Sequence, residues 1–426
     1  MGFSNFLFFP FAGFVLFCCI KSKDKFGTWL NHYALTNAFW VFSLGLSIFF
    51  NDYLRPVSDD VYMIFFIGLI VFNVTMFVSK IPKLPKTISI EEHSLLRRRI
   101  LEIGILLIFL PIAYNNFLLM QAGVDLWEIN HDFWDTHKNS SLYLQNVLQQ
   151  NIGSPLMYVL MVTCFYTVYN YGGHKKLQNY LTLLIGTSFA IMYVLVSGGG
   201  RTIIMKIMFI YTLSTLAWYN LRNQNVIFKI KNSFLIVFVV LALFAIGWAS
   251  LERGHTEELS EILGSRLTLF PALFESYYTT TDICEGYTFG YSMFETPISF
   301  LIYPLKILGI TIDVRRISGI ESERLFVPAL GGETNAYVSA YLYYMRDFGK
   351  LGVIIGPFLV GLVYNWIWKM CRQNSFLLLF YFVGIGITCL DSTYPFKRGF
   401  VFILLFAYLY RKFVIRSHKQ TQTIKK

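Results

Sequence analysis

A glycine-rich turn followed by an arginine is the first group of residues that could do chemistry. Residues 197–202 read Ser-Gly-Gly-Gly-Arg-Thr. The backbone N–H groups of Gly199 and Gly200 can point inward together, and Arg201 adds a planar cation. With the positive end of the helix that follows, these groups could cradle a phosphate. The alternative is a tight turn between two helices, in which the glycines serve conformation alone.

A carboxylate and an imidazole follow one another closely at Glu252 and His255, with Arg253 between them. Either Glu252 or His255 could take a proton from an attacking hydroxyl group, as a general base does. Arg253 could hold an anionic ligand beside that base. The alternative is a solvated cluster at the membrane boundary.

Several further arginines fall in segments that we expect to face outward. Lysine suffices to set topology, whereas the arginine fork can grip an oxyanion through two parallel hydrogen bonds. Pairing with the acidic residues of segment 251–347 is the alternative for any one of them, and surface pairs of that kind contribute little. The candidate anion-binding residues of this group are Arg266, Arg315, Arg316 and Arg346.

The stretch from Asn335 to Gly361 combines aromatic residues, a charged pair and spaced glycines. An aromatic amphipathic segment leads into Arg346-Asp347-Phe348-Gly349 and then into an apolar span. We expect Asp347 to bind substrate, to orient a neighbouring arginine, or to cap the ninth membrane helix. The glycines of the span should allow another helix to approach closely, and they are Gly352, Gly356 and Gly361.

The elements that must position these residues are membrane helices. Of the 426 residues, 55% are hydrophobic and only 14% charged, far below the roughly 25% charged residues of soluble domains. Apolar runs close to the ~20 residues needed to cross a bilayer recur along the chain. The sequence predicts an all-α, polytopic helical bundle of about eleven spans, near 3–20, 33–50, 61–78, 100–120, 154–171, 180–196, 203–219, 233–250, 348–368, 375–390 and 397–413.

The distribution of Lys and Arg predicts the orientation of the bundle. Most of them fall inside if the N-terminus is outside and the C-terminus is in the cytoplasm. Two segments then face outward, residues 121–153 and the long loop 251–347 between the eighth and ninth spans. Within that loop, residues 297–312 read as an interfacial stretch because Pro304 and Lys306 interrupt it. We expect a single transmembrane domain over residues 1–426.

Neither a metal site nor a nucleic-acid partner is expected. His131, Asp132 and His137 lie close together, but their spacing does not repeat on one helix face. The net charge of +11 sits mostly in short loops between apolar runs, where it sets topology.

The sequence resembles the O-antigen polymerase (Wzy) and oligosaccharide repeat unit polymerase family. The resemblance rests on the spans, the large late loop, Ser-Gly-Gly-Gly-Arg-Thr, and above all Asp-Phe-Gly-x-x-Gly within residues 335–361. It implies a bacterial inner-membrane glycosyltransferase that moves a growing glycan from undecaprenyl pyrophosphate onto a new lipid-linked repeat unit at the periplasmic face. Lipid-linked donor and acceptor, membrane lipid and a chain-length regulator are the implied partners. No nucleotide sugar and no cofactor are needed.

Two other functions remain open from the sequence. A flippase or transporter would be expected to show internal repeats and charged residues at mid-depth in its spans, and neither is evident. An O-antigen ligase shares the architecture and the lipid donor, so the sequence separates it poorly from a polymerase.

Overall fold

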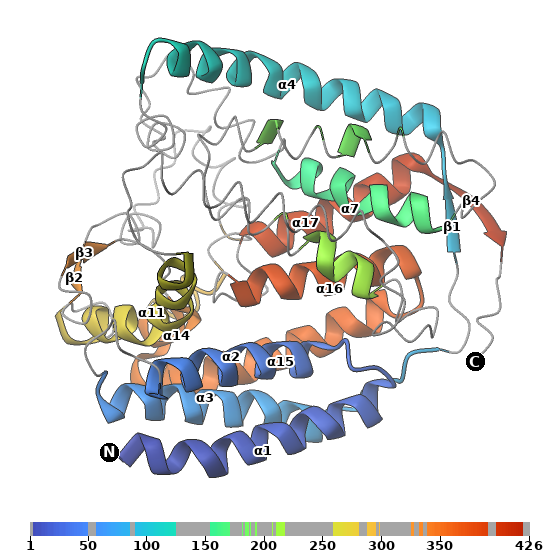
Figure 1. Ribbon diagram of the computed structural model, residues 1–426. Coiled ribbons are helices and arrows are strands. Elements are labelled where there is room, and N and C mark those ends of the chain that lie inside the picture. Colours follow the sequence, from blue (N-terminus) through green and yellow to red (C-terminus); the bar gives the residue numbers. More distant parts are fainter. Residues whose placement is uncertain are drawn as a thin grey trace. The chain divides into compact units, whose positions relative to one another are not determined.

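The computed structural model is mostly helical (Figure 1). The chain divides into two compact units, and each unit is built from separate stretches of the sequence. The structure describes residues 3–49, 57–85, 90–124, 154–170, 259–280, 288–294, 325–327, 332–334, 339–390 and 398–420, with single residues or short pieces between 181 and 217 and Ile298. The first unit comprises Met1–Leu84, Glu257–Met370 and Thr388–Val401. The second comprises Pro85–Thr256, Cys371–Ile387 and Phe402–Lys426.

Three long apolar helices begin the first unit: α1 (Phe3–Phe26), α2 (His32–Phe49) and α3 (Asp59–Val78). Aromatic rings fill the space between them, and the rings of Phe11 and Phe66 stack with centroids 4.3 Å apart. A pair of neutral amides also joins α2 to α3. Asn37 donates to Asn73 over 2.7 Å, and Asn73 donates back over 2.9 Å, so both buried side chains are satisfied.

The rest of the first unit comes from late in the chain. It contains α11 (Leu259–Thr280), α14 (Ala340–Phe348) and most of α15 (Gly352–Cys371). Two short antiparallel strands, β2 (Leu325–Val327) and β3 (Gly332–Thr334), pair with each other. The helix α11 lies inside the segment expected to be a long outer loop. Apolar residues at helical spacing explain it, since Leu269, Phe270, Leu273 and Phe274 are all buried.

The chain folds back on itself between α14 and α15. A short 3₁₀ turn, η4 (Gly349–Leu351), separates the two helices, and Gly349 has a φ of 57°. A Cβ atom at Gly352 would collide with the carbonyl of Tyr344, and one at Gly356 would collide with its ring. Residues twelve apart on a straight helix would be about 18 Å apart, so this contact requires a sharp bend. The expected close approach at these glycines is confirmed.

The second unit contains α4 (Leu95–Gln121), α7 (Ser154–Asn170) and most of α16 (Ser375–Leu390) and α17 (Arg398–Val414). Two contacts join α7, α16 and α17. The hydroxyl groups of Tyr166 and Ser375 share a hydrogen bond of 2.9 Å, and the rings of Phe376 and Tyr410 stack with their centroids 5.6 Å apart. Two strands, β1 (Ile90–His93) and β4 (Ile415–Gln420), pair antiparallel and tie the start of α4 to the end of α17.

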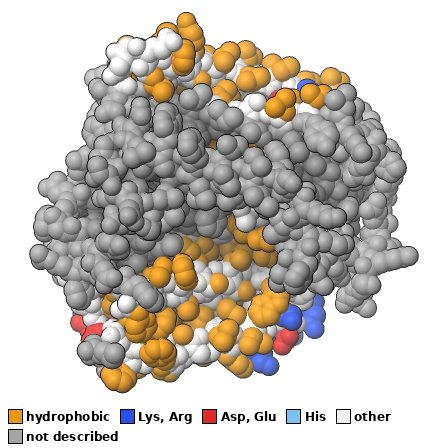
Figure 2. All heavy atoms as spheres, in the orientation of Figure 1, with side chains coloured by type: hydrophobic (Ala, Val, Ile, Leu, Met, Phe, Trp, Pro, Cys, Tyr) orange, Lys and Arg blue, Asp and Glu red, His pale blue; other side chains and the backbone are white. Residues whose placement is uncertain are grey.

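Four helices of the described chain are long and apolar enough to cross a membrane. They are Ser4–Phe26, Asp59–Val78, Leu96–Gln121 and the bent segment Ala340–Cys371. Figure 2 shows hydrophobic side chains covering much of the described surface, with basic side chains gathered near one end of α1. Lys21 and Lys23 are exposed in that last part of α1, as expected at a membrane boundary.

Helices are present at most of the expected spans. They coincide with the stretches near 3–20, 33–50, 61–78, 100–120, 154–171, 348–368, 375–390 and 397–413. The stretches 180–196 and 203–219 are described only in part, and 233–250 lies outside the described residues. Most of segment 121–153 and of the interfacial stretch 297–312 also lies outside them. The two short antiparallel strand pairs in the described chain were not predicted.

Candidate functional site

The carboxylate of Asp347 holds a distant turn of the chain, residues 288–294. Asp347 is the eighth residue of α14 and has no exposed surface. One carboxylate oxygen accepts hydrogen bonds from the hydroxyl of Thr288 and the N–H of Ser292, the latter at 2.8 Å. The other accepts from the N–H of Met293, also at 2.8 Å. We call Asp347 with its three partners the Asp347 clamp.

The backbone strengthens the Asp347 clamp. The N–H of Thr288 donates to the carbonyl of Arg346, and the N–H of Phe289 donates to the carbonyl of Asp347, both at 3.2 Å. Within the turn, Phe294 donates to Gly290 over 3.0 Å, which is one helical turn. The carboxylate therefore acts as an N-cap supplied from elsewhere in the chain, and its charge favours the N-terminal end of that turn.

One residue of this turn, Phe289, is aromatic and has an unusual backbone conformation. Phe289 has a φ of 48°, and its side chain is 85% exposed. Left-handed backbone at a residue other than glycine costs about 1–2 kcal/mol, so the surrounding hydrogen bonds must stabilise it. The result is a fixed turn that presents a large apolar ring at the surface of the first unit.

Asp347 does not cap the ninth membrane helix. That helix, α15, begins at Gly352, after the 3₁₀ turn. The prediction of a cap was wrong because the bend at Gly349 turns α14 away from the axis of α15. The aromatic stretch before it also differs from expectation, since every residue from Ala340 to Asp347 is buried. A segment with both apolar and polar faces is thus enclosed on all sides.

A small cavity lies beside α14 in the first unit. Its volume is about 40 Å³. Tyrosine, threonine and tryptophan side chains contribute to its lining, together with the first residues of α14: Thr36, Trp40, Leu69, Phe72, Ala340, Tyr341, Tyr344, Pro357, Val360, Tyr364, Thr388 and Cys389. The cavity therefore offers hydroxyl groups and aromatic faces, and no charged side chain of the described residues lines it.

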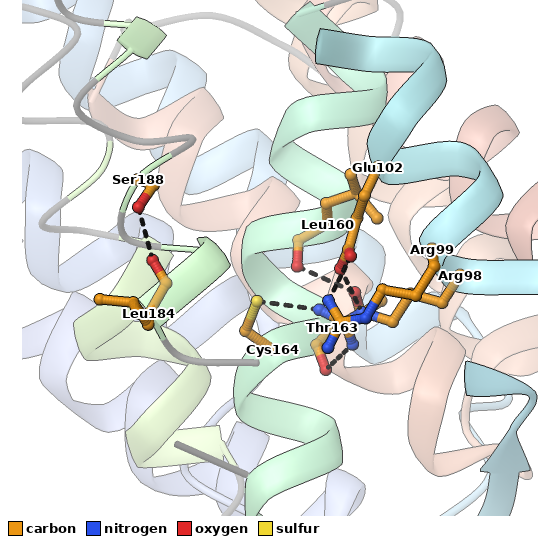
Figure 3. A network of polar contacts seen from close by, with 8 residues as sticks. All are labelled: Arg98, Arg99, Glu102, Leu160, Thr163, Cys164, Leu184 and Ser188. Carbon is orange, nitrogen blue, oxygen red and sulfur yellow. Dashed lines mark hydrogen bonds and ion pairs between the residues drawn. The ribbon is translucent and has the colours of Figure 1, made fainter. Parts of the chain in front are cut away.

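A second buried charge lies in the second unit, at the start of α4 (Figure 3). Arg98 has no exposed surface and donates to Glu102 over 2.8 Å. Its guanidinium also donates to the carbonyl of Thr163 at 3.2 Å and to the sulfur of Cys164 at 2.9 Å, both on α7. Arg99 forms a second ion pair with Glu102. We call this group the Arg98 cluster; it joins α4 to α7.

Of the predicted site residues, the structure describes the side chains of Arg346 and Asp347, which are neighbours in the sequence. Arg346 is buried, with 7% of its surface exposed. Arg266 lies on α11, but its side chain is outside the described part. The remaining candidates lie outside the described residues: Gly199, Gly200, Arg201, Glu252, Arg253, His255, Arg315 and Arg316. Within the described ranges, no group of three or more His, Cys, Asp or Glu side chains could hold a metal ion.

The partners of Asp347 were not predicted, and neither was the Arg98 cluster. Thr288, Ser292 and Met293 carry no signal that would link them to a residue about 55 positions away. Arg98 and Glu102 stand four residues apart, the spacing of an ion pair on one helix face, so the sequence does carry a signal for this pair.

Comparison with known proteins identifies no relative: no family model, no curated protein and no solved structure matches this chain.

Proposed function

We propose that this chain is a glycosyltransferase of the O-antigen polymerase type, embedded in a bacterial inner membrane by about eleven helices. It would lengthen a surface polysaccharide at the periplasmic face, with its N-terminus periplasmic and its C-terminus cytoplasmic. Donor and acceptor would both be oligosaccharides linked to undecaprenyl pyrophosphate, and a chain-length regulator is a candidate partner. The proposal rests on the resemblance of residues 335–361 and on the apolar helices, which suit a substrate with a lipid tail.

The observation that supports it best is the Asp347 clamp. The residues that carry the resemblance, Arg346 to Gly349, form a buried junction between α14 and α15. That junction fixes a turn in the expected outer loop and presents the exposed ring of Phe289. Aromatic rings pack on the apolar faces of sugars, so a rigidly held ring suits a glycan substrate.

The proposed reaction transfers a glycan without a cofactor. The acceptor hydroxyl oxygen attacks the anomeric carbon of the donor sugar, and the bond from that carbon to the pyrophosphate oxygen breaks. Glu252 or His255 takes the hydroxyl proton, and the lipid pyrophosphate leaves with the bonding electrons. Arg201 and Arg253 would neutralise the pyrophosphate beside Gly199 and Gly200. Arg266, Arg315, Arg316 or Arg346 would assist them.

A flippase for the same lipid-linked unit is the second candidate. A short buried helix that bends into a spanning helix, as α14 does, is a device that transporters use at their substrate sites. A ligase uses the same donor lipid, and no contact within the described residues favours it over a polymerase.

Deletion of the gene followed by analysis of the cell's glycan separates these functions. If the chain is a polymerase, its deletion leaves single repeat units attached to the final acceptor in place of long chains. Repeat units trapped on the cytoplasmic side would indicate a flippase instead. Loss of all attached glycan, with polymer still made on the carrier lipid, would indicate a ligase.

Complementation then tests the proposed residues. Arg201→Ala should fail to restore long chains at normal protein levels, because the pyrophosphate loses a cation. Lys412→Ala is a matched control, since Lys412 is an exposed cation on the expected cytoplasmic side. Full-length chains with Arg201→Ala would contradict the proposed phosphate cradle.

A further inference from the structure

The first turn of α14 lies deep inside the first unit. Ala340 and Tyr341 are each 4% exposed. The ring of Tyr341 packs against Phe65 and Trp40, with centroids 4.6 and 6.0 Å away. Trp40 and Phe65 belong to α2 and α3, well away from the ends of those helices. The positive end of a nine-residue helix thus points into the interior of a helical unit instead of into water.

The donors at this helix end lack their usual acceptor. The N–H groups of a first helical turn have no partner within the helix, and a serine before it normally supplies one through its hydroxyl oxygen. Ser339 stands at that capping position with φ −70° and ψ 157°, but its side chain makes no cap hydrogen bond. Leu342 donates to the carbonyl of Ser339 over 3.1 Å. Ala340 and Tyr341 supply the remaining N–H groups at the tip.

The hydroxyl of Ser339 is itself unsatisfied. Ser339 has no exposed surface, and its oxygen has no hydrogen-bond partner within the described part of the chain. A buried polar atom without a partner is rare in native proteins and calls for a ligand, an ion or water. The helix end and this hydroxyl belong to adjoining residues, so one acceptor placed between them would satisfy both.

The adjoining cavity has room for a small group. Ala340 and Tyr341 border this cavity, and its volume is about 40 Å³. A water molecule needs roughly 10–15 Å³ of such space, so the cavity takes about three atoms of that size. This matches the oxygens of a carboxylate or a phosphodiester.

The charge of the lining limits the charge of the ligand. Among the described residues, none that lines the cavity is acidic, basic or a histidine. The positive field that these residues supply comes from the end of α14 and is equivalent to about half an elementary charge. That field offsets part of a single negative charge and a smaller part of a double one, so the site favours a singly charged group.

We infer that the N-terminus of α14 binds a singly charged oxyanion group, with the hydroxyl of Ser339 and the N–H groups of Ala340 and Tyr341 as donors. The group is a carboxylate, as in an acidic sugar, or a phosphodiester, as in a lipid. The inference stands whether or not the chain transfers glycans, because it rests on the donors and the cavity alone.

Thermal unfolding of the purified full chain, at constant ionic strength, tests this site. The probes are acetate for the carboxylate and dimethyl phosphate for the phosphodiester, each against its neutral analogue, acetamide or trimethyl phosphate. At least one anion should raise the melting temperature while its neutral analogue does not. Acetate alone points to an acidic sugar, dimethyl phosphate alone to a lipid, and both to an unselective site.

Variants at the cap give the decisive comparison. Ser339→Asp places a carboxylate at the helix end, so it should raise the melting temperature without anion and abolish the response. Ser339→Ala should weaken the anion about tenfold, as expected for one lost hydrogen bond to a charged group. Ser58→Asp is the matched control, because Ser58 is an exposed cap of α3 that also makes no side-chain cap bond.

Three results would overturn the inference: no response of the unaltered chain to either anion, an unchanged response in both Ser339 variants, or an equal loss in Ser58→Asp. If Ser339→Asp fails to fold, Ser339→Ala alone decides, since removing an unpaired hydroxyl should leave the fold intact. No glycan is present in the assay, so its failure is separate from failure of the proposed polymerase function.

Discussion

The Asp347 clamp and the Arg98 cluster both enclose a charge, but they satisfy it in different ways. Arg98 meets a carboxylate, Glu102, on its own helix, and a carbonyl and a sulfur on α7. Asp347 instead meets a hydroxyl and two backbone N–H groups, all on one turn far away in the chain. An ion pair between residues four apart can form on almost any helix. A carboxylate held by backbone donors fixes the path of one particular segment.

This difference indicates different purposes for the two groups. The Arg98 cluster pairs one buried carboxylate with two guanidinium groups and fastens α4 to α7, which is a structural role. The Asp347 clamp shapes a turn that carries an exposed aromatic ring, and it lies in the segment that resembles a glycan polymerase. We expect variants of the cluster to lower stability, and variants of the clamp to lower activity beyond what their stability loss explains.

The largest expected effect is on the Arg98 cluster. Glu102→Ala leaves the guanidinium of Arg98 buried without its carboxylate, which should cost about 3–5 kcal/mol of unfolding free energy. Denaturant unfolding in detergent micelles measures this. Arg99→Ala is the matched control, because Arg99 is 33% exposed and also pairs with Glu102. Its effect should stay below about 1 kcal/mol. Equal losses would show that Arg98 does not depend on the pair.

The next effect concerns the Asp347 clamp. Asp347→Asn removes the charge and one acceptor oxygen, so a buried N–H at Ser292 or Met293 loses its partner at a cost of about 1–3 kcal/mol. Glycan chain length at matched protein levels should also fall sharply. Asp60→Asn, at an exposed position in the first turn of α3, is the control and should change neither quantity. If the glycan kept its normal length with Asp347→Asn, the Asp347 clamp would have no role in activity that distinguishes it from the Arg98 cluster.

A further effect, on stability alone, is expected from shifting the helix that carries Asp347. Gly356→Ala forces a methyl group into the ring of Tyr344 on α14, and overpacking of this kind costs about 1–3 kcal/mol. The unfolding midpoint in detergent measures the loss. Gly104→Ala on α4 is the control, because nothing lies within 4 Å of the added carbon. If both variants were equally stable, the bend between α14 and α15 would be looser than described.

The smallest effect provides an uncharged reference for both groups. Asn37 and Asn73 join α2 and α3 through reciprocal amide hydrogen bonds. Their coupling in a double-mutant cycle with alanine should be about 0.6 kcal/mol, the average for hydrogen bonds between membrane helices. A coupling as large as the loss in Glu102→Ala would mean that charge is not what separates the strong contacts from the weak ones.

The sequence predicted the positions of the helices well because membrane helices follow from local composition alone. Runs of apolar residues near 3–20, 61–78 and 100–120 need no knowledge of tertiary contacts. Their ends were less accurate: α1 extends to Phe26 because Lys21, Lys23 and Lys25 continue the helix past its apolar part. Membrane spans and helices need not end at the same residue.

The candidate site could be predicted only in part. Asp347 was among the candidates because it lies in the Arg-Asp-Phe-Gly stretch, which carries the resemblance and leads into an apolar span. Its partners at 288–294 could not be found, because a hydrogen bond to backbone N–H groups leaves no trace in residue type. The bend at Gly349 could not be predicted either, so the sequence did not show that α14 folds back against α15. Spaced glycines at 352 and 356 predicted a close neighbour, but not that the neighbour is Tyr344 of the preceding helix.

Reconstitution in liposomes tests whether this chain polymerises lipid-linked repeat units. The purified full chain in liposomes is given a repeat unit on a polyprenyl pyrophosphate, and the products are analysed by mass spectrometry. If the chain is a polymerase, the glycans grow by whole repeat units, and one polyprenyl pyrophosphate is released for each addition. The products made by the Asp347→Asn variant should be far shorter. Repeat units that remain single with the unaltered, folded chain would contradict it.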